Sequence, residues 1–242
     1  MINSKANEIY KNLVKLKKDK NFLFLDSPKL IKEAINAGYD VECIILREKE
    51  KCLLSGFQTI EFSTSLFENL QSTINSQGQI AVIKNTKKII KAPTGNFLVL
   101  DEVQDPGNVG TLIRSAVGFD FKDIYLINSV NILNEKLVRS SMGGVFKANV
   151  YEMSRKEFVA FYDENLKGYD LVCADMNGKN IFEKQNLKNV GLVVGNEGNG
   201  VSEQMRTLCK KTISIPMQNN LESLNVAVAG SIIMCLITNL QK

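Results

Sequence analysis

The chain has 242 residues, a length that fits one large domain or two modest ones. Hydrophobic residues make up 44% of the sequence and charged residues 23%, proportions that predict a soluble protein with a real core. The formal net charge is only +4, and so small an excess gives weak support for a nucleic-acid partner.

Histidine is absent from the chain, and the five cysteines are scattered without a Cys-x-x-Cys spacing. Because zinc sites draw on His and Cys at short spacings, we expect no metal site. Without histidine, any proton transfer has to use Arg, Lys, Asp, Glu, Tyr, Cys or groups on the substrate. An odd number of scattered cysteines indicates reduced, mostly buried thiols, which is typical of the cytoplasm.

No segment predicts a membrane span or a secretion signal. The most apolar run, residues 224–237, is short and is interrupted by Asn225 and Ser231. The N-terminus shows no signal-peptide pattern. We therefore expect a cytoplasmic protein without membrane contact.

The first part of the chain predicts a small α/β unit. Its hydrophobic periodicity indicates alternating elements, with helices over 5–18 and 28–37 and strands over 21–27, 41–46 and 80–84. The first twenty residues hold six lysines against two acidic residues. Such a face is most often a solvated helix surface, and a contact with RNA phosphates is the alternative. In that alternative, the candidate RNA contacts are Lys15, Lys17 and Lys18.

A change in composition marks a domain boundary. The segment KNTKKIIKAPTGN, residues 84–96, is rich in Lys and Thr, and Pro93 followed by Thr and Gly predicts a break. We therefore predict an N-terminal domain over 1–90 and a second domain over 95–242.

The second part predicts a parallel sheet covered by helices on both faces, because short apolar strands alternate with helices. The expected strands are 97–100, 123–127, 169–174, 190–194 and 212–215. The expected helices are 108–118, 135–141, 155–166, 202–209 and 222–239. In such sheets ligands bind beyond the carboxyl ends of the strands. Three polar loops follow predicted strands, so we expect one site at that edge.

The first of these loops lies in LDEVQDPGNVGTLIRSA, residues 100–116. Asp105, Pro106 and Gly107 have turn chemistry and are best explained as structural, and Asn108 can cap the helix that follows. Arg114 belongs to an otherwise apolar helix. Taken from this helix alone, it is more often an ion-paired or snorkelling side chain than a functional one.

The second loop, in LVVGNEGNGVS at 192–202, places three glycines directly after an apolar strand. Glycine allows a ligand to approach the backbone closely. Val201 and Ser202 resemble the helix cap, so Glu197 is better explained by pairing with a ligand or an arginine.

The third segment, ISIPMQNNLESLNVAVAG at 213–230, carries Ser223 and Asn225 near one helix start. Together they offer more polar groups than a cap needs. The small residues Ala227, Ala229 and Gly230 predict close packing against another helix, within or between subunits.

Two nucleotide-binding classes are disfavoured. The GNVGTL segment lacks the G-x-G-x-x-G spacing, and the next strand ends in Asn128 rather than an acidic residue, which argues against a dehydrogenase. The sequence has no G-x-x-x-x-G-K-[ST] pattern, which excludes a P-loop NTPase.

These three segments, in this order and spacing, resemble the SpoU (TrmH-like) branch of the SPOUT methyltransferases. NEKLVRSSMGGVF at 134–146 matches the stretch between the first two. The resemblance is strong over 97–242. The first ninety residues resemble, less specifically, the family's substrate-binding domain, which is related to ribosomal RNA-binding proteins.

The resemblance implies an α/β fold whose parallel sheet ends in a C-terminal trefoil knot, preceded by a small α/β RNA-binding domain. It also implies S-adenosyl-L-methionine as methyl donor, a homodimer, and methylation of a ribose 2′-hydroxyl in RNA. By position it assigns catalysis to Asn108, Arg114, Glu197, Ser223 and Asn225. Cofactor contacts fall at Gly195, Asn196, Ile215, Met217 and Leu224, and Arg139 faces RNA.

The family's usual assignment makes Arg114 the activator of the hydroxyl, but a guanidinium holds its proton too firmly to act as a free base. Our hypothesis is that Arg114 fixes the adjacent phosphate and stabilises developing alkoxide charge, while the proton passes to a phosphate oxygen or water. Asn108, Ser223 and Asn225 would orient the ribose, and Glu197 would hold Arg114 or the cofactor.

The chain departs from the family at two places. Asn219 and Asn220 stand where the family often has Gly, although Asn tolerates the left-handed conformation. Asp26 and Ser27 replace a frequent Glu-Gly pair, which bears on the choice of RNA. The separate N-terminal domain favours 23S rRNA as substrate. A tRNA 2′-O-methyltransferase and a non-catalytic RNA-binding protein are the alternatives.

Overall fold

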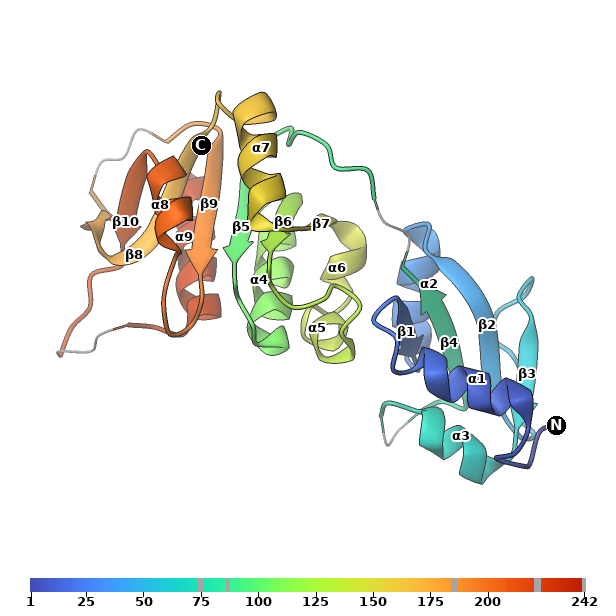
Figure 1. Cartoon of the computed structure of the whole chain (residues 1–242). Coiled ribbons are helices and arrows are strands. Elements are labelled where there is room, and N and C mark those ends of the chain that lie inside the picture. Colours follow the sequence, from blue (N-terminus) through green and yellow to red (C-terminus); the bar gives the residue numbers. More distant parts are fainter. Residues whose placement is uncertain (74–75, 86–87, 184–186, 220–222, 241–242) are drawn as a thin grey trace. The chain divides into compact units, whose positions relative to one another are not determined.

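The computed structural model describes residues 1–73, 76–85, 88–183, 187–219 and 223–240. The chain forms two compact units. One comprises Met1–Lys87 with Leu133–Glu135, and the other comprises Lys88–Ile132 with Lys136–Lys242. Figure 1 shows the course of the chain through both. None of the described helices is long and apolar enough to cross a membrane.

The N-terminal unit is a four-stranded sheet with helices packed on it. Its sheet has the order β1-β4-β2-β3, in which β2 and β3 are parallel and the other two pairs are antiparallel. The helices are α1 (Glu8–Leu16), α2 (Pro28–Asn36) and α3 (Thr64–Leu70), and the strands are β1 (Phe22–Leu25), β2 (Asp40–Arg47), β3 (Thr59–Phe62) and β4 (Gln79–Lys84). The short β3 and α3 are absent from the elements predicted for this region, because four and seven residues hold too little periodicity to detect.

Among the three lysines predicted to contact RNA, Lys17 is hydrogen-bonded within its own unit. Its Nζ donates hydrogen bonds to the carbonyl oxygens of Leu70 and Gln71, at 2.7 and 3.0 Å. Partial burial lowers the pKa of this amine, against the opposing effect of nearby carboxylates. Lys17 therefore satisfies carbonyls at the C-terminal end of α3. Lys15 and Lys18 are exposed.

The C-terminal unit is a six-stranded parallel sheet with the order β10-β8-β9-β5-β6-β7. The strands are β5 (Phe97–Asp101), β6 (Asp123–Ile127), β7 (Asn149–Met153), β8 (Asp170–Asn180), β9 (Val190–Gly195) and β10 (Lys211–Ser214). The helices are α4 (Pro106–Gly118), α5 (Glu135–Ser140), α6 (Gly144–Lys147), α7 (Arg155–Asn165), α8 (Glu203–Leu208) and α9 (Val226–Leu240). The predicted α/β class with a parallel sheet is confirmed.

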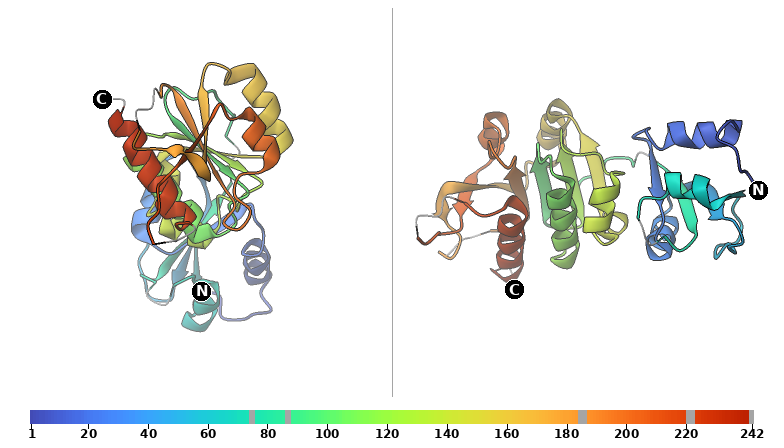
Figure 2. Two further views of the ribbon diagram at one scale, coloured as in Figure 1. Left: turned by 90° about the vertical axis from the view of Figure 1, so that its left-hand side faces the viewer. Right: turned by 90° about the horizontal axis from the view of Figure 1, so that it is seen from below.

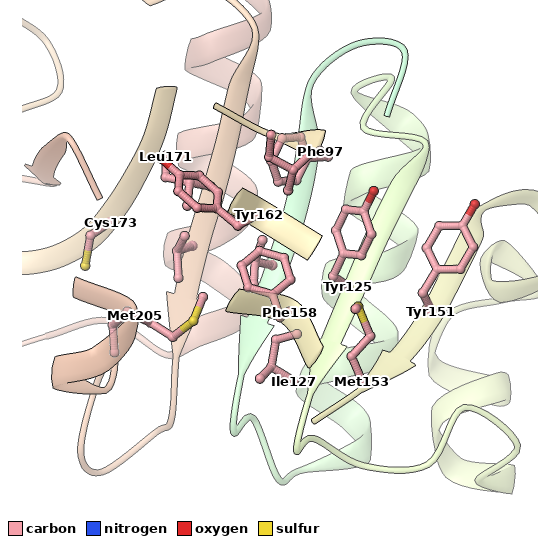
Figure 3. Packing of buried hydrophobic residues seen from close by; sticks show 14 residues of the cluster. Phe97, Tyr125, Ile127, Tyr151, Met153, Phe158, Tyr162, Leu171, Cys173 and Met205 are labelled. Atoms are coloured by element: carbon pink, nitrogen blue, oxygen red, sulfur yellow. The ribbon is translucent and has the colours of Figure 1, made fainter. Parts of the chain in front are cut away.

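The sheet of the C-terminal unit is buried on both faces. Every residue of β5, β6 and β9 is buried, which is the pattern of continuous apolar strands in a parallel sheet. Figure 2 shows α7 and α8 on one face and α4 and α9 on the other. On the first face, Figure 3 shows Phe158 of α7 and Met205 of α8 packed over Tyr125 and neighbouring strand residues. The sheet is therefore a rigid frame for the loops at its edge.

Three predicted helix starts are wrong by a few residues. The first helix was predicted from residue 5, but α1 begins at Glu8, with Asn7 as its N-cap. Helix α4 begins at Pro106, with Asp105 as N-cap, because the Asp105 carboxylate accepts from the backbone N–H of Asn108 at 2.9 Å. Asn108 is therefore not the cap, and its side chain is available for other contacts. Helix α9 begins at Val226 rather than at 222, and residue 222 lies outside the described residues. Ser202 caps α8, as predicted.

Candidate active site

The first two polar loops lie side by side, because their strands are neighbours. β5 and β9 pair in parallel and Asp101 is opposite Gly195, so both strands end at the same level. The side-chain amide of Asn196 donates to the carbonyl oxygen of Glu102 at 2.9 Å. Its oxygen accepts from the backbone N–H groups of Gly198 and Asn199. Asn196 thus shapes the second loop and joins it to the first.

Glu197, at the tip of the second loop, accepts three hydrogen bonds from the first loop. The donors are the backbone N–H groups of Gln104 and Asp105, at 3.4 and 3.2 Å, and the side-chain amide of Asn108, at 3.0 Å. Burial alone would raise the pKa of this carboxyl group, but these hydrogen bonds outweigh burial and hold the pKa below its ordinary value. Glu197 is therefore an ionised acceptor that holds Asn108.

The third segment joins the same chain of hydrogen bonds through Asn225. The Asn225 amide nitrogen donates to the side-chain oxygen of Asn108 at 3.0 Å. The Asn225 oxygen accepts from the backbone N–H groups of Ala227 and Val228, so Asn225 is also the cap of α9. The Glu197–Asn108–Asn225 chain thus connects all three polar segments, which lie far apart in the sequence.

Arg114 and Ser223 are not part of this chain. Arg114 is six residues beyond Asn108, which places it about 240° around the helix axis. Its backbone lies 3.4 Å from the position that a Cβ would occupy on Gly144 of α6, and its side chain is exposed. Glu197 was predicted to hold Arg114 or the cofactor; within the described residues its hydrogen-bond donors are Gln104, Asp105 and Asn108, and its contact with the cofactor stays a prediction. Ser223 is exposed.

The glycines of the second loop differ in what they allow. A Cβ on Gly195 would lie 2.1 Å from the carbonyl carbon of Gly200, so the loop's own backbone requires glycine there. A Cβ on Gly198 would meet nothing closer than a side-chain oxygen of Asn196 at 3.6 Å, which is an ordinary van der Waals contact, so the loop's own packing does not require glycine there.

The other predicted cofactor residues lie around the third segment. Ile215 and Met217 follow β10, Leu224 precedes α9, and all three are partly buried. Asn219 has a φ of 57°, so asparagine adopts the left-handed conformation that was expected of it. Asn220 lies outside the described residues.

Arg139, the predicted RNA-facing residue, is exposed in the last turn of α5. This helix is attached to the first loop, because Lys136 pairs with Asp105 at 2.7 Å and the Ser140 hydroxyl donates to the carbonyl oxygen of Pro106. No group of three or more potential metal ligands occurs among the residues that the structure describes.

Sequence reasoning missed two features of this edge. The backbone N–H groups of Gln104 and Asp105 carry no side-chain signal, so their role as donors to Glu197 is visible only in three dimensions. Arg155, at the start of α7, forms ion pairs with Asp101, the last residue of β5, and with Glu102, which follows it. Nothing in its own sequence neighbourhood points to these partners.

The comparison with known families decides the relationship of this chain. The model of the "SpoU rRNA Methylase family" matches residues 95–235, which include all three polar segments. The chain belongs to this family. It is 30% identical over 243 residues to the 23S rRNA (guanosine(2553)-2′-O)-methyltransferase RlmP of Bacillus subtilis (strain 168), with 96% of this chain and 97% of the relative covered.

Solved structures of SpoU proteins have the same fold. The SpoU methyltransferase AviRb of Streptomyces viridochromogenes, crystallised with the cofactor AdoMet, superposes with a TM-score of 0.83 at 21% identity, covering 97% of this chain and 99% of that chain. A putative RNA methyltransferase of the TrmH family from Porphyromonas gingivalis has a TM-score of 0.80 at 25% identity, with 94% and 95% covered. The SpoU fold therefore extends over nearly the whole chain.

The Glu197→Gln variant tests whether this carboxylate is held in its ionised form. A group whose pKa is lowered by folding adds stability above its unfolded pKa and loses it as the pH falls through the folded value. Urea denaturation should therefore show Glu197→Gln less stable than wild type near pH 7, with the gap closing below about pH 4.5. The exposed Glu164→Gln is the charge-matched control, expected to follow wild type. A Glu197→Gln deficit that does not change with pH would contradict this prediction.

Proposed function

We propose that this protein is an S-adenosyl-L-methionine-dependent RNA methyltransferase that modifies a ribose 2′-hydroxyl, with 23S rRNA as its substrate. The observation that carries the proposal is the Glu197–Asn108–Asn225 chain of hydrogen bonds, which unites three segments that the family model matches. An rRNA substrate places the protein in the cytoplasm. The similarity to RlmP over 96% of this chain supports rRNA rather than tRNA.

The cofactor fits the edge where the second and third segments end. Gly195, Asn196, Ile215, Met217 and Leu224 would hold it, largely through backbone groups, and a Cβ on Gly198 would make no close contact. The ionised Glu197 contributes negative charge, which is favourable near a sulfonium cation. When bound, the cofactor supplies an electrophilic methyl group. The same cofactor is named in the AviRb complex.

The chain's own residues would position the nucleophile. Asn108, which Glu197 holds, and Asn225, which donates to Asn108, would orient the ribose together with the exposed Ser223. Arg114 is an exposed cation outside every ion pair of the described residues, and an RNA phosphate is a partner suited to its planar fork. The proton of the 2′-hydroxyl would pass to a phosphate oxygen or to water, because a guanidinium does not accept it.

The remaining predictions concern the domains and the assembly. We propose that residues 1–90 form the RNA-binding domain, with Lys15 and Lys18 among its contacts, that residues 95–242 form the catalytic domain, and that Arg139 contacts RNA. The resemblance to the family also leads us to propose a trefoil knot at the C-terminal end of the sheet and a homodimer.

Helix α9 supports the homodimer. It contains no charged residue, and its Ala227, Gly230 and Ile233 are buried against the unit. On another side, Val228 is 47% exposed, and Ile232 and Leu236 are partly exposed. These three lie four residues apart and form one apolar stripe, which a second copy of the helix would cover.

Methylation in vitro tests the activity. The purified protein is incubated with S-adenosyl-L-methionine and with rRNA or tRNA from cells that lack this protein. It should add one 2′-O-methyl group to 23S rRNA. The modified nucleotide is mapped as a stop of reverse transcription or as a position resistant to alkaline cleavage. Arg114→Ala should lower kcat about 100-fold or more, as loss of a charged transition-state contact does, with cofactor affinity unchanged. Lys122→Ala, an exposed cation paired with Asp120, is the control.

Three outcomes would contradict this assignment. Modification of tRNA alone would favour the tRNA alternative. Failure to bind S-adenosyl-L-methionine, with RNA binding intact, would favour a non-catalytic protein. Near wild-type activity of Arg114→Ala or Arg114→Lys would remove the role proposed for this side chain.

The apolar stripe on α9 gives a direct test of the dimer. Replacing Ile232 with Glu would place a charge in the proposed interface, so light scattering after gel filtration should show a monomer where wild type is a dimer. Thr207→Glu, on the exposed side of α8, is the matched control and should remain dimeric. A dimeric Ile232→Glu variant, or a monomeric wild type, would contradict the proposed interface.

A further inference from the structure

A buried carboxylate lies at the end of the central strand β5. The Asp101 side chain has no exposed surface, and its two oxygens have separate partners. One accepts from Nη2 of Arg155 at 3.0 Å, and the other accepts from the backbone N–H of Ser202 at 2.8 Å. Because an unpaired buried charge is strongly destabilising, Asp101 depends on both contacts.

Arg155 connects this carboxylate with a second one. The same Nη2 pairs with Glu102 at 2.8 Å, and the arginine side chain is only 21% exposed. Arg155 is the first residue of α7, behind a capping box formed by Ser154 and Glu157. Its backbone is thus fixed by α7, while its guanidinium spans the point where β5 passes into the first loop.

Both ends of the second loop are attached to the two residues that Arg155 holds. At one end, the carbonyl oxygen of Glu102, whose φ is 60°, accepts from the side-chain amide of Asn196. At the other end, the N–H of Ser202 donates to Asp101. Glu197 lies between these anchors, so its position against Asn108 depends on the backbone at 101–102.

We propose that Arg155 is a positioning residue for methyl transfer: by pairing with Asp101 and Glu102 it fixes the second loop and thereby the Glu197–Asn108 contact. This inference rests on the function proposed above. It assigns Arg155 no contact with cofactor or RNA. A left-handed conformation at a non-glycine residue is unfavourable, and the Glu102–Arg155 pair offsets that cost where the loop begins.

The test compares Arg155→Met with wild type in the full-length protein. Amide hydrogen exchange should become at least about tenfold faster at residues 196–202, while the strand Asp123–Ile127 keeps its protection. With rRNA and S-adenosyl-L-methionine, kcat should fall about 100-fold, as a displaced catalytic group does, with a smaller change in the KM for RNA. Arg155→Lys should recover part of the exchange protection and part of kcat. A lysine ammonium can pair with one carboxylate, but it lacks the planar guanidinium that pairs with two.

Asp170→Asn is the matched control, because it removes a carboxylate that pairs with Lys210 and Lys211 at the opposite, amino-terminal end of the sheet. It should leave exchange at 196–202 and kcat at wild-type values. If Arg155→Met does not fold, the Glu102→Gln variant replaces it in the test, because it keeps the buried Asp101–Arg155 pair. Glu102→Gln should still make amide exchange at 196–199 faster and lower kcat severalfold.

The exchange measurement separates this inference from the proposed function, because it needs no substrate. Faster exchange at 196–202 in a protein without methyltransferase activity would show that Arg155 fixes the second loop, and it would overturn the proposed function alone. Wild-type exchange and kcat in Arg155→Met, or equal effects in Asp170→Asn, would overturn the positioning role. If Arg155→Met does not fold, wild-type exchange in Glu102→Gln overturns it in the same way.

Discussion

The structure of the site depends on one side-chain amide whose donor and acceptor are both engaged. Asn108 donates to Glu197 and accepts from Asn225, so its orientation is fixed from two sides. This arrangement requires β5 and β9 to end at the same level, which their parallel register with Asp101 opposite Gly195 provides. It also requires α9 to begin at the site, which Asn225 ensures as its cap. Hydrogen bonds on both sides restrict the rotation of this amide, and a side chain held in one orientation can orient a substrate.

Most of the frame of the C-terminal unit could be predicted from the sequence, because its central strands are continuous apolar runs such as Phe97–Asp101. The edge strand β7 was missed, because exposed Asn149 and Glu152 interrupt its apolar residues. The convergence of three polar loops at one edge followed from the geometry of parallel sheets. The N-terminal sheet was predicted less completely, since β3 has only four residues and little alternation. The proposed trefoil knot could not be predicted from hydrophobic periodicity, because the spacing of apolar residues reports local conformation and not the path of the chain.

Individual side chains were harder to predict than segments, for physical reasons that differ. Lys17 looks like its neighbours in a lysine-rich helix, and only the fold brings carbonyls of α3 to its amine. Glu197 was expected to pair with a ligand or an arginine, and its donors in the structure include backbone N–H groups, which have no sequence signature. Arg114 was grouped with Asn108 because they share a motif, but six residues of helix turn them to different sides. A shared motif therefore indicates that residues belong to one site, but it does not show which of their side chains are in contact.

The central claim is that Glu197, Asn108 and Asn225 act as one unit in catalysis. A double-mutant cycle on kcat/KM with Asn108→Ala and Asn225→Ser tests it, because serine keeps an α9 cap while losing the amide donor. We expect the double variant to be little worse than the more damaged single variant, with a coupling of about 1 kcal/mol or more. If the fold-losses in kcat/KM of the two single variants multiply in the double variant, the two amides act independently, which would contradict this claim.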